Sequence, residues 1–210
     1  MVLAVLVGLL VAADLGARSV AEQQLRDRVA AAAHSTGPTT ARIGSFPFLG
    51  RLLTSGTVSQ VRVSTADVTV DGLTLARISL DLQDVTFDRG RLLSDRKVVL
   101  DALGHGTAEA EVTQEQLSDR LGVPITLTPG RVQVRVAGQL VAAKASVSDN
   151  TLHVTVAGLS LPGLKIPTLP LVPCVADAVI LAGRIRMTCS VDQIPPELVG
   201  RPLDQLKPSP

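Results

Sequence analysis

The sequence predicts an α+β fold, in which a curved, bulged antiparallel β-sheet is wrapped with a few helices. From Val58 to Phe87, apolar and polar residues alternate in short sets of period two, the pattern of strands that have one apolar and one polar face. Asp71-Gly72 interrupts this alternation and predicts a hairpin turn. At Ala76-Arg77 and Gln83-Asp84 the alternation changes phase without Gly or Pro. We expect β-bulges there, because bulges insert a residue, bend the sheet and increase its twist.

The composition limits what such a sheet can do. A chain of 210 residues, 46% hydrophobic and 19% charged, suffices for one domain with a sizeable core. Its net charge of +1 gives no general attraction to nucleic acid. The chain has three Phe, no Tyr and no Trp, so base-stacking sites and most sugar sites are poorly supported. The core must therefore be built from Val, Leu, Ile and Ala.

The N-terminal residues 1–13 are uninterruptedly apolar. As a helix they would extend about 20 Å, too short for a hydrocarbon core of about 30 Å. We expect a signal peptide, with Val11-Ala12-Ala13 as a small-residue cleavage site, or a membrane anchor. A buried core helix is the alternative.

A second helix is expected over residues 14–36, where Leu15, Leu25 and Val29 form a narrow apolar stripe beside a wide polar surface. Such a helix would lie along a membrane surface or over one end of the sheet. Residues 35–38 (STGP) end it with a linker signal. Residues 37–200 are then expected to form a single domain, and residues 201–210 a disordered tail.

Two short helices and further strands are expected within this domain. Pro47 suits the first turn of a helix over residues 48–54, and residues 113–116 (TQEQ) form a capping-box pattern for a helix that ends at Gly122. Residues 88–97 read as a loop with four basic residues and two acids. The other expected strands are 98–103, 106–112, 125–127, 131–136, 139–145, 152–156, 178–181 and 184–191.

The C-terminal third contains an apolar segment and the two cysteines. Residues 159–173 include four prolines, which cannot occupy a central strand, so we expect an extended strap. Cys174 and Cys189 would close a loop of about 15 residues as a disulfide, worth about 3 kcal/mol in the chain-entropy model. Two buried free thiols are the alternative.

The sequence contains no catalytic or metal-binding constellation. His34, His105 and His153 have no Cys, Asp or Glu partner at ligand spacing, and we expect them at the surface or in loops. P-loop, complete G-x-G-x-x-G and G-x-S-x-G motifs do not occur. We therefore predict no metal, no cofactor and no enzymatic activity.

The segment 43–49 (IGSFPFL), followed by 61–63 (VRV), 71–75 (DGLTL) and 80–85 (LDLQDV), resembles the LmeA family of actinobacterial, extracytoplasmic phospholipid-binding proteins. The likeness runs in order from Val20 to Val156. It implies a curved sheet akin to the tubular lipid-binding folds, enclosing a slot for acyl chains. In mycobacterial relatives it also implies a role in the maturation of cell-envelope lipoglycans.

We therefore expect a non-catalytic phospholipid-binding protein of the cell envelope, outside the cytoplasmic membrane, that buries acyl chains in an aliphatic slot. Its expected partners are a phospholipid, a membrane surface and a membrane-bound envelope enzyme, but not nucleic acid. The side chains expected against the acyl chains are Phe46, Phe48, Leu73, Leu75, Ile78, Leu80, Leu82 and Phe87. Those expected near the headgroup are Arg42, Arg51, Arg89, Arg91, Arg96 and Lys97, and a solvated loop is the alternative for the last four.

Two other functions are compatible with the sequence. A structural or scaffold protein of the envelope would fill the sheet with its own side chains and dock a membrane enzyme through the apolar strap. An unrecognised hydrolase would need a His or Ser beside an acid in a pocket. Without the family resemblance, a sheet filled by the protein's own helices is the simpler interpretation. With it, lipid binding is favoured, because each buried methylene contributes about 0.8 kcal/mol.

Overall fold

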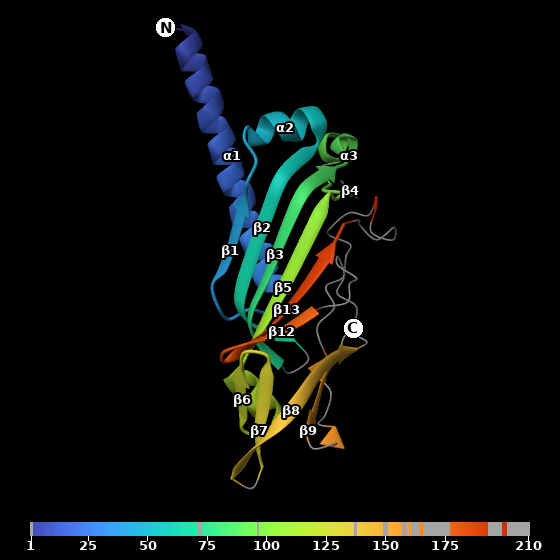
Figure 1. Cartoon of the computed structure of the whole chain (residues 1–210). Coiled ribbons are helices and arrows are strands. Elements are labelled where there is room, and N and C mark those ends of the chain that lie inside the picture. Colours follow the sequence, from blue (N-terminus) through green and yellow to red (C-terminus); the bar gives the residue numbers. More distant parts are fainter. Residues whose placement is uncertain are drawn as a thin grey trace.

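The computed structural model describes residues 2–70, 73–95, 97–136, 138–148, 151–156, 159–160, 164–165, 177–192 and 199–200. Its helices are α1 (Val2–Ala32), α2 (Phe48–Ser55), α3 (Arg89–Ser94) and α4 (Gln114–Leu121). The strands form two antiparallel sheets, both open within the described residues, so the predicted α+β fold is confirmed (Figure 1).

The first sheet has the order β1-β2-β3-β5-β13-β12, with β4 paired to β3. Its strands are β1 (Thr39–Ile43), β2 (Thr57–Val70), β3 (Leu73–Phe87), β4 (Leu100–Ala102), β5 (His105–Thr113), β12 (Asp177–Leu181) and β13 (Arg184–Val191). The second sheet has the order β10-β9-β8-β7-β6, with β11 paired to β9. Its strands are β6 (Ile125–Thr128), β7 (Arg131–Val136), β8 (Gln139–Ser148), β9 (Thr151–Val156), β10 (Leu159–Ser160) and β11 (Leu164–Lys165).

The hairpin predicted around Asp71-Gly72 is formed by β2 and β3, which pair up to Val70 and Leu73; the two turn residues themselves lie outside the described residues. The register of β2 on β3 is the same on both sides of Ala76-Arg77 and of Gln83-Asp84, so the bulges predicted there are wrong in position. Instead Asp84, and Asp67 on the opposite strand, have positive φ of 51°. A register shift does occur between Thr86 and Phe87, where β4 joins β3.

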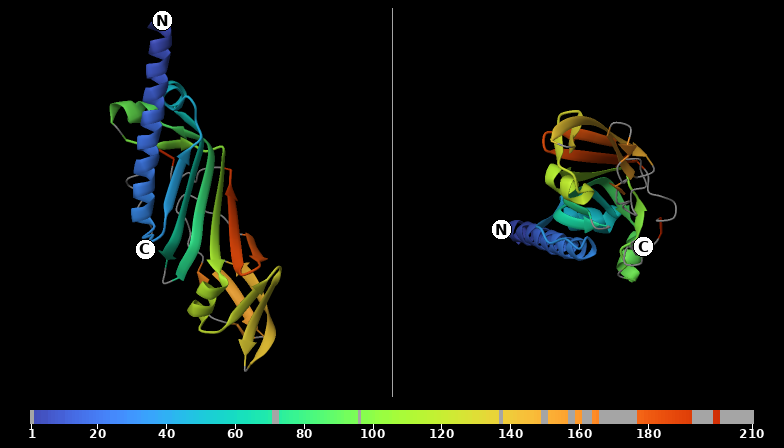
Figure 2. Two further views of the ribbon diagram at one scale, coloured as in Figure 1. Left: turned by 90° about the vertical axis from the view of Figure 1, so that its left-hand side faces the viewer. Right: turned by 90° about the horizontal axis from the view of Figure 1, so that it is seen from below.

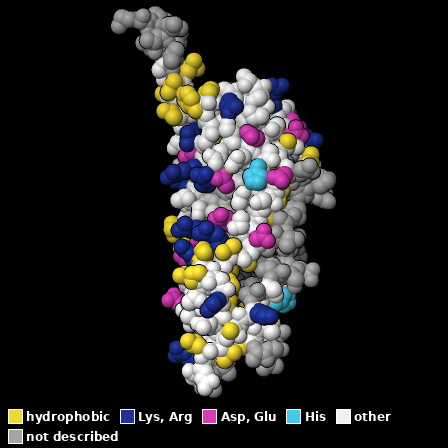
Figure 3. Space-filling model, in the orientation of Figure 1, with side chains coloured by type: hydrophobic (Ala, Val, Ile, Leu, Met, Phe, Trp, Pro, Cys, Tyr) yellow, Lys and Arg dark blue, Asp and Glu magenta, His cyan; other side chains and the backbone are white. Residues whose placement is uncertain are grey.

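The first sheet has one polar and one apolar face, as the alternation predicts. On the polar face Arg62 donates to Asp81 at 2.6 Å, and Arg186 donates to Glu111 at 2.9 Å. Arg184 adds a second, longer contact to Glu111 at 3.6 Å. Charged side chains of both signs are visible over the sheet in Figure 3. This face is therefore charge-paired and solvated.

Residues 2–32 form one continuous helix rather than two segments. Residues 8–13 are exposed, whereas Asp14 is buried and its carboxylate accepts the N–H groups of Phe48 at 2.9 Å and Leu49 at 2.6 Å. Further along, Glu22 accepts the Ile43 N–H at 2.8 Å. From Asp14 onward α1 thus lies along the first sheet, while its N-terminal part projects beyond it (Figures 1 and 2).

No helix in the described part of the chain is both long enough and apolar enough to cross a membrane. The signal peptide or anchor over residues 1–13 stays a prediction.

The loop predicted over residues 88–97 contains helix α3. Asp88 caps it by accepting the Arg91 N–H at 3.1 Å. This helix is weakly indicated by the sequence, because Gly90 disfavours a helix and the segment is too short for a periodic apolar stripe. The predicted capping box of α4 is confirmed, as is its end at Gly122, which has a positive φ of 68°.

Two other predictions lie wholly or largely outside the described residues. The strap over 159–173 is described only at β10 and β11, and the tail over 201–210 is not described. The strands predicted over 178–181 and 184–191 are confirmed by the pairing of β12 with β13.

Candidate functional site

The apolar face of the first sheet includes β3, the strand that contains six of the eight predicted acyl-contacting residues. Cross-strand pairing arranges its side chains in rows that run across five strands. One row is Ile43, Val61, Leu82, Gly106 and Val191, and the next is Ala41, Val63, Leu80, Ala108 and Cys189. A third row is Thr39, Thr65, Ile78, Ala110 and Met187. This face is therefore continuous and largely aliphatic, as a sheet with period-two alternation requires.

One end of this face is covered by helices. The buried side chains of Ile43, Phe48 and Val58 form a cluster against which Ala17 and Ala21 of α1 pack, together with Phe87. Asp14 fixes α2 at this point by capping its first two N–H groups. Burial of an aromatic or branched side chain contributes about 1.5–3 kcal/mol, so this cover is well anchored.

The other end is covered by α4 and the second sheet. Val68, Leu75, Val112 and Ile185 of the first sheet are buried against Leu117 of α4 and a set of second-sheet residues. That set is Ile125, Leu127, Val132, Val134, Val154 and Val156. This is the main core of the protein, and it joins the two sheets into one packed unit.

Between these two covers lies a third, smaller cluster. Ala108, Cys189 and Val191 are buried, and half-buried Leu80 and Leu103 pack against them. Within the described residues, every member of this cluster belongs to the first sheet or to the turn before β5. We call Leu80, Leu82, Leu103, Gly106, Ala108, Cys189 and Val191 the central apolar strip.

Gly106 lets two leucine side chains pack closely on the backbone of β5. A Cβ atom at this position would lie 3.2 Å from the Cδ2 atoms of both Leu82 and Leu103, which is tighter than ordinary van der Waals contact. The side chains of Leu82 and Leu103 thus occupy the space above Gly106, and a larger residue at this position would displace them. The strip combines large and small apolar side chains, without a charged group among its members.

The eight predicted acyl-contacting residues are not gathered in one place. Leu75 and Ile78 belong to the main core, and Phe48 and Phe87 to the cluster under α1 and α2. Leu80 and Leu82 lie in the central apolar strip. Phe46 is 63% exposed beside α2. Leu73 starts β3, and its side chain is outside the described part of the chain.

The predicted headgroup residues separate into two groups. Arg42 is exposed between the buried Ala41 and Ile43, so it is on the polar face, paired in register with Arg62. Four others lie on or beside α2 and α3 and are exposed: Arg51, Arg89, Arg91 and Lys97. Arg96 is outside the described residues.

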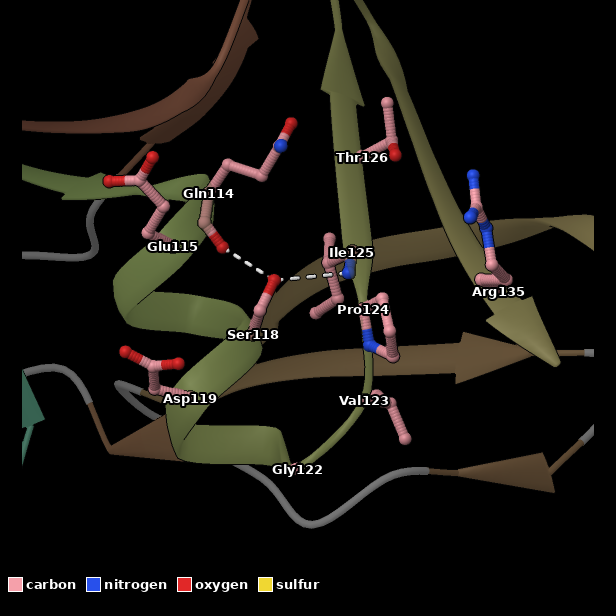
Figure 4. Close-up of a pocket in the computed structure, with 10 residues that line it drawn as sticks. All are labelled: Gln114, Glu115, Ser118, Asp119, Gly122, Val123, Pro124, Ile125, Thr126 and Arg135. Carbon is pink, nitrogen blue, oxygen red and sulfur yellow. Dashed lines mark hydrogen bonds between the residues drawn. The ribbon is translucent and has the colours of Figure 1, made fainter. Parts of the chain in front are cut away.

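A pocket of about 630 Å³ opens between α4 and β6, far along the chain from the predicted slot (Figure 4). Its lining includes Glu115 and Asp119 of α4 and Arg135 of β7, and none of the predicted acyl-contacting residues. Ser118 there donates to the Gln114 carbonyl at 2.7 Å and accepts the Ile125 N–H at 3.0 Å. These bonds join α4 to β6, so the Ser118 hydroxyl stabilises the fold.

One arrangement of polar residues was missed by the sequence analysis. His105 Nδ1 lies 2.6 Å from Asp192 Oδ1, and its Nε2 lies 3.2 Å from Thr107 Oγ1. Asp192 is 87 residues away in the chain, so no local spacing could reveal it. The order hydroxyl, imidazole, carboxylate is that of a hydrolytic triad. The Asp192 side chain is 82% exposed, however, and none of the three lines the pocket of Figure 4.

Other chemistry of the site is limited. Across the described residues, no three His, Cys, Asp or Glu side chains are grouped so that they could hold a metal ion. No cysteine of the described part is free, and Cys189 is buried in the central apolar strip. Cys174 lies outside the described residues, so the Cys174–Cys189 disulfide stays a prediction.

The first sheet is thus an open antiparallel sheet with a charge-paired polar face and an aliphatic strip on its other face. A family model described as LmeA-like phospholipid-binding matches residues 12–209, nearly the whole chain. The chain therefore belongs to the LmeA-like phospholipid-binding family, as the sequence resemblance predicted. No curated protein and no solved structure matches it.

Proposed function

We propose that this chain is a non-catalytic phospholipid-binding protein of the cell envelope, which holds acyl chains against the central apolar strip. The family supports phospholipid binding. The placement of the acyl chains on the central apolar strip is supported by the separation of three side-chain clusters on one face of the first sheet. Two are covered by α1, α2, α4 and the second sheet, whereas among the described residues the strip between them is built from the first sheet and its adjoining turn.

The proposal narrows the set of acyl-contacting residues. Leu75, Ile78, Phe48 and Phe87 pack within the protein's own core, so their contribution is to shape the two ends of the strip. Leu80 and Leu82 are half-buried and remain the direct contacts, with Leu103 beside them. Sheathing ten methylenes of one acyl chain would contribute about 8 kcal/mol before ordering costs, enough for useful affinity after several kcal/mol are subtracted.

The headgroup is proposed to lie toward the end of the molecule that carries α2 and α3. That end provides Arg51, Arg89, Arg91 and Lys97, all exposed. Arginine suits phosphate because its planar guanidinium offers paired N–H donors. Arg42 is removed from the headgroup set, since it lies on the opposite, polar face of the sheet.

The cellular setting is proposed from the family and from the apolar N-terminus. An extracytoplasmic protein, secreted or anchored through residues 1–13, would meet phospholipid at the membrane surface. There it would support envelope or lipoglycan maturation together with a membrane-bound envelope enzyme. His105, Thr107 and Asp192 are assigned no catalytic role, because an acyl-transfer site needs a water-excluding pocket around its triad and the Asp192 side chain is 82% exposed.

A second candidate function has one observation in its favour. Four of the eight predicted acyl-contacting residues pack against the protein's own side chains, as expected of a scaffold protein with a solid core. Such a protein would dock a membrane enzyme without carrying lipid.

The experiment that separates these functions measures phospholipid in the gently purified full chain by native mass spectrometry and by lipid extraction. We expect one bound phospholipid in the wild type, and a loss of at least tenfold in the Leu80→Gln, Leu82→Gln double variant, because two polar side chains would be desolvated against the acyl chain. Leu140→Gln, an exposed leucine of the second sheet, is the matched control and should retain lipid. Lipid-free wild-type protein would favour the scaffold, whereas equal lipid in all variants would contradict the placement of the acyl chains on the central apolar strip.

A further inference from the structure

The end of the molecule that carries α2 and α3 exposes large apolar side chains. Phe46 is 63% exposed, Leu53 of α2 is 48% exposed and Leu93 of α3 is 60% exposed. Val98, which follows α3, is also exposed. We call these four residues, with Arg51, Arg89, Arg91 and Lys97, the α2–α3 surface. The two helices are joined directly, since Arg89 donates to the carbonyl of Thr54.

The basic residues of this surface are mostly free of acidic partners. Within the described residues, Arg91 contacts Asp88 at 3.6 Å, whereas Arg51, Arg89 and Lys97 form no ion pair. Arg51 donates instead to the hydroxyl of Ser59. These positive charges therefore remain available to an anionic partner, in contrast to the paired charges on the polar face of the sheet.

Helix α1 leaves the domain at the same end. Asp14 of α1 accepts hydrogen bonds from the first residues of α2. Beyond it Leu9, Leu10 and Val11 are exposed, and the helix continues past α2 and α3 (Figures 1 and 2). Figure 3 shows apolar side chains along this part of α1, next to the end that carries α2 and α3. The apolar N-terminus and the α2–α3 surface thus point toward one common partner.

We propose that the α2–α3 surface docks on a lipid bilayer that contains anionic headgroups. Phe46, Leu53 and Leu93 enter the headgroup region, while Arg51, Arg89 and Lys97 contact lipid phosphates. The proposal rests on the proposed function, because it puts the headgroup end of the bound phospholipid next to the membrane from which the lipid comes. In this orientation the first sheet extends away from the membrane, and the second sheet lies at the end of the molecule farthest from the bilayer.

The chemistry of the surface favours a bilayer over a protein partner. Along the chain its apolar side chains alternate with cations, a composition typical of peripheral membrane-binding segments, in which apolar groups insert and basic groups attract anionic lipid. A protein interface would instead concentrate apolar residues in a central patch depleted of charge.

Insertion can be measured directly because the chain has no tryptophan. Leu53→Trp places a single fluorophore on α2, and Leu140→Trp places one on an equally exposed leucine of the second sheet. The full-length variants are mixed with vesicles of phosphatidylcholine and phosphatidylglycerol whose acyl chains are brominated. We expect the Leu53→Trp fluorescence to shift to the blue and to be quenched, and the Leu140→Trp fluorescence to remain unchanged.

Charge is tested by co-sedimentation with the same vesicles without bromine. Neutralising Arg51 and Lys97 to glutamine should weaken binding about fivefold per residue, an effect lost in pure phosphatidylcholine. The matched control, Arg131→Gln with Lys144→Gln, removes two exposed charges from the second sheet and should leave binding unchanged.

Three results would overturn the proposal: no binding to anionic vesicles, quenching at Leu140→Trp but not at Leu53→Trp, or equal effects of the two charge pairs. Binding through residues 1–13 alone would give sedimentation without quenching at Leu53→Trp, and this too would contradict it. Failure of the proposed lipid-binding function can be distinguished from failure of membrane docking. A protein that does not bind lipid would be lipid-free after purification, whether or not it binds vesicles.

Discussion

Two carboxylates fix α1 to the rest of the protein. Asp14 accepts two N–H groups at the start of α2, and Glu22 accepts the N–H of Ile43 in β1. Arg18 donates to the same Glu22 carboxylate at 3.0 Å. Charged acceptors form stronger hydrogen bonds than neutral ones, so these two residues define the point from which α1 belongs to the folded domain.

The hydrogen bond from the Ile43 N–H to the Glu22 carboxylate makes the attachment of α1 to β1 sensitive to acid. Burial acts to raise the pKa of Glu22, but the hydrogen bonds from Ile43 and Arg18 and the charges of Arg18 and Arg26 outweigh it, so the pKa lies below its ordinary value of 4.5. A carboxyl with a lowered pKa stabilises the folded state above its unfolded pKa, and this stabilisation is lost as the pH falls through the folded pKa.

We therefore expect Glu22→Gln to be less stable than the wild type near neutral pH, with a difference that shrinks as the pH drops below 4.5. Denaturant unfolding at a series of pH values measures this difference. Glu115→Gln, an exposed acid of α4, is the control and should show little difference at any pH. A Glu22→Gln difference that is independent of pH would contradict the assignment.

At the scale of the element, the β2–β3 pair keeps its apolar residues on one face despite two changes of phase. The strands do this without an extra residue, by rotating the chain at Asp67 and Asp84, which both have φ of 51°. Aspartate is among the few residues other than glycine that accept this conformation. The sequence revealed where the alternation changes but not how, because bulges and positive-φ residues produce the same apolar pattern.

This geometry predicts opposite effects for two substitutions of Asp84. Asp84→Gly should leave the free energy of unfolding unchanged or raise it, because glycine adopts positive φ without a steric penalty. Asp84→Val should lower it by about 1–2 kcal/mol, since a β-branched residue is poorly accommodated there. Equal losses in the two variants, measured by denaturant unfolding, would exclude strain at this position.

Sequence periodicity predicts neither helix α3 nor which parts of the apolar face of the first sheet are covered by other layers. The segment from Arg89 to Ser94 has too few apolar residues for a helical stripe, and its helix depends on the Asp88 cap. Leu75 and Leu80 have the same alternation in sequence, yet one lies in the main core and the other in the central apolar strip. What separates them is that α4 and the second sheet pack on Leu75, and these contacts join residues far apart in the sequence.

For the whole molecule, the strand order could not be read from the sequence, although most strands could. β13 pairs with β5, whose sequence neighbours include α4, and this pairing brings Asp192 to His105 and Cys189 beside Ala108. The chemistry of the candidate site was more accessible, since aliphatic alternation and the 43–49 segment already indicated a lipid-binding sheet. The division of that sheet face into two covered ends and a central strip needed the structure.

The central claim is that acyl chains contact the central apolar strip. The most direct test is nuclear magnetic resonance of leucine-methyl-labelled protein saturated with a phospholipid, recording intermolecular contacts from acyl methylenes to assigned methyl groups. We predict contacts to Leu80, Leu82 and Leu103, and none to Leu75 in the main core or to the exposed Leu140. Bound lipid whose acyl chains contact neither Leu80 nor Leu82 would contradict the account.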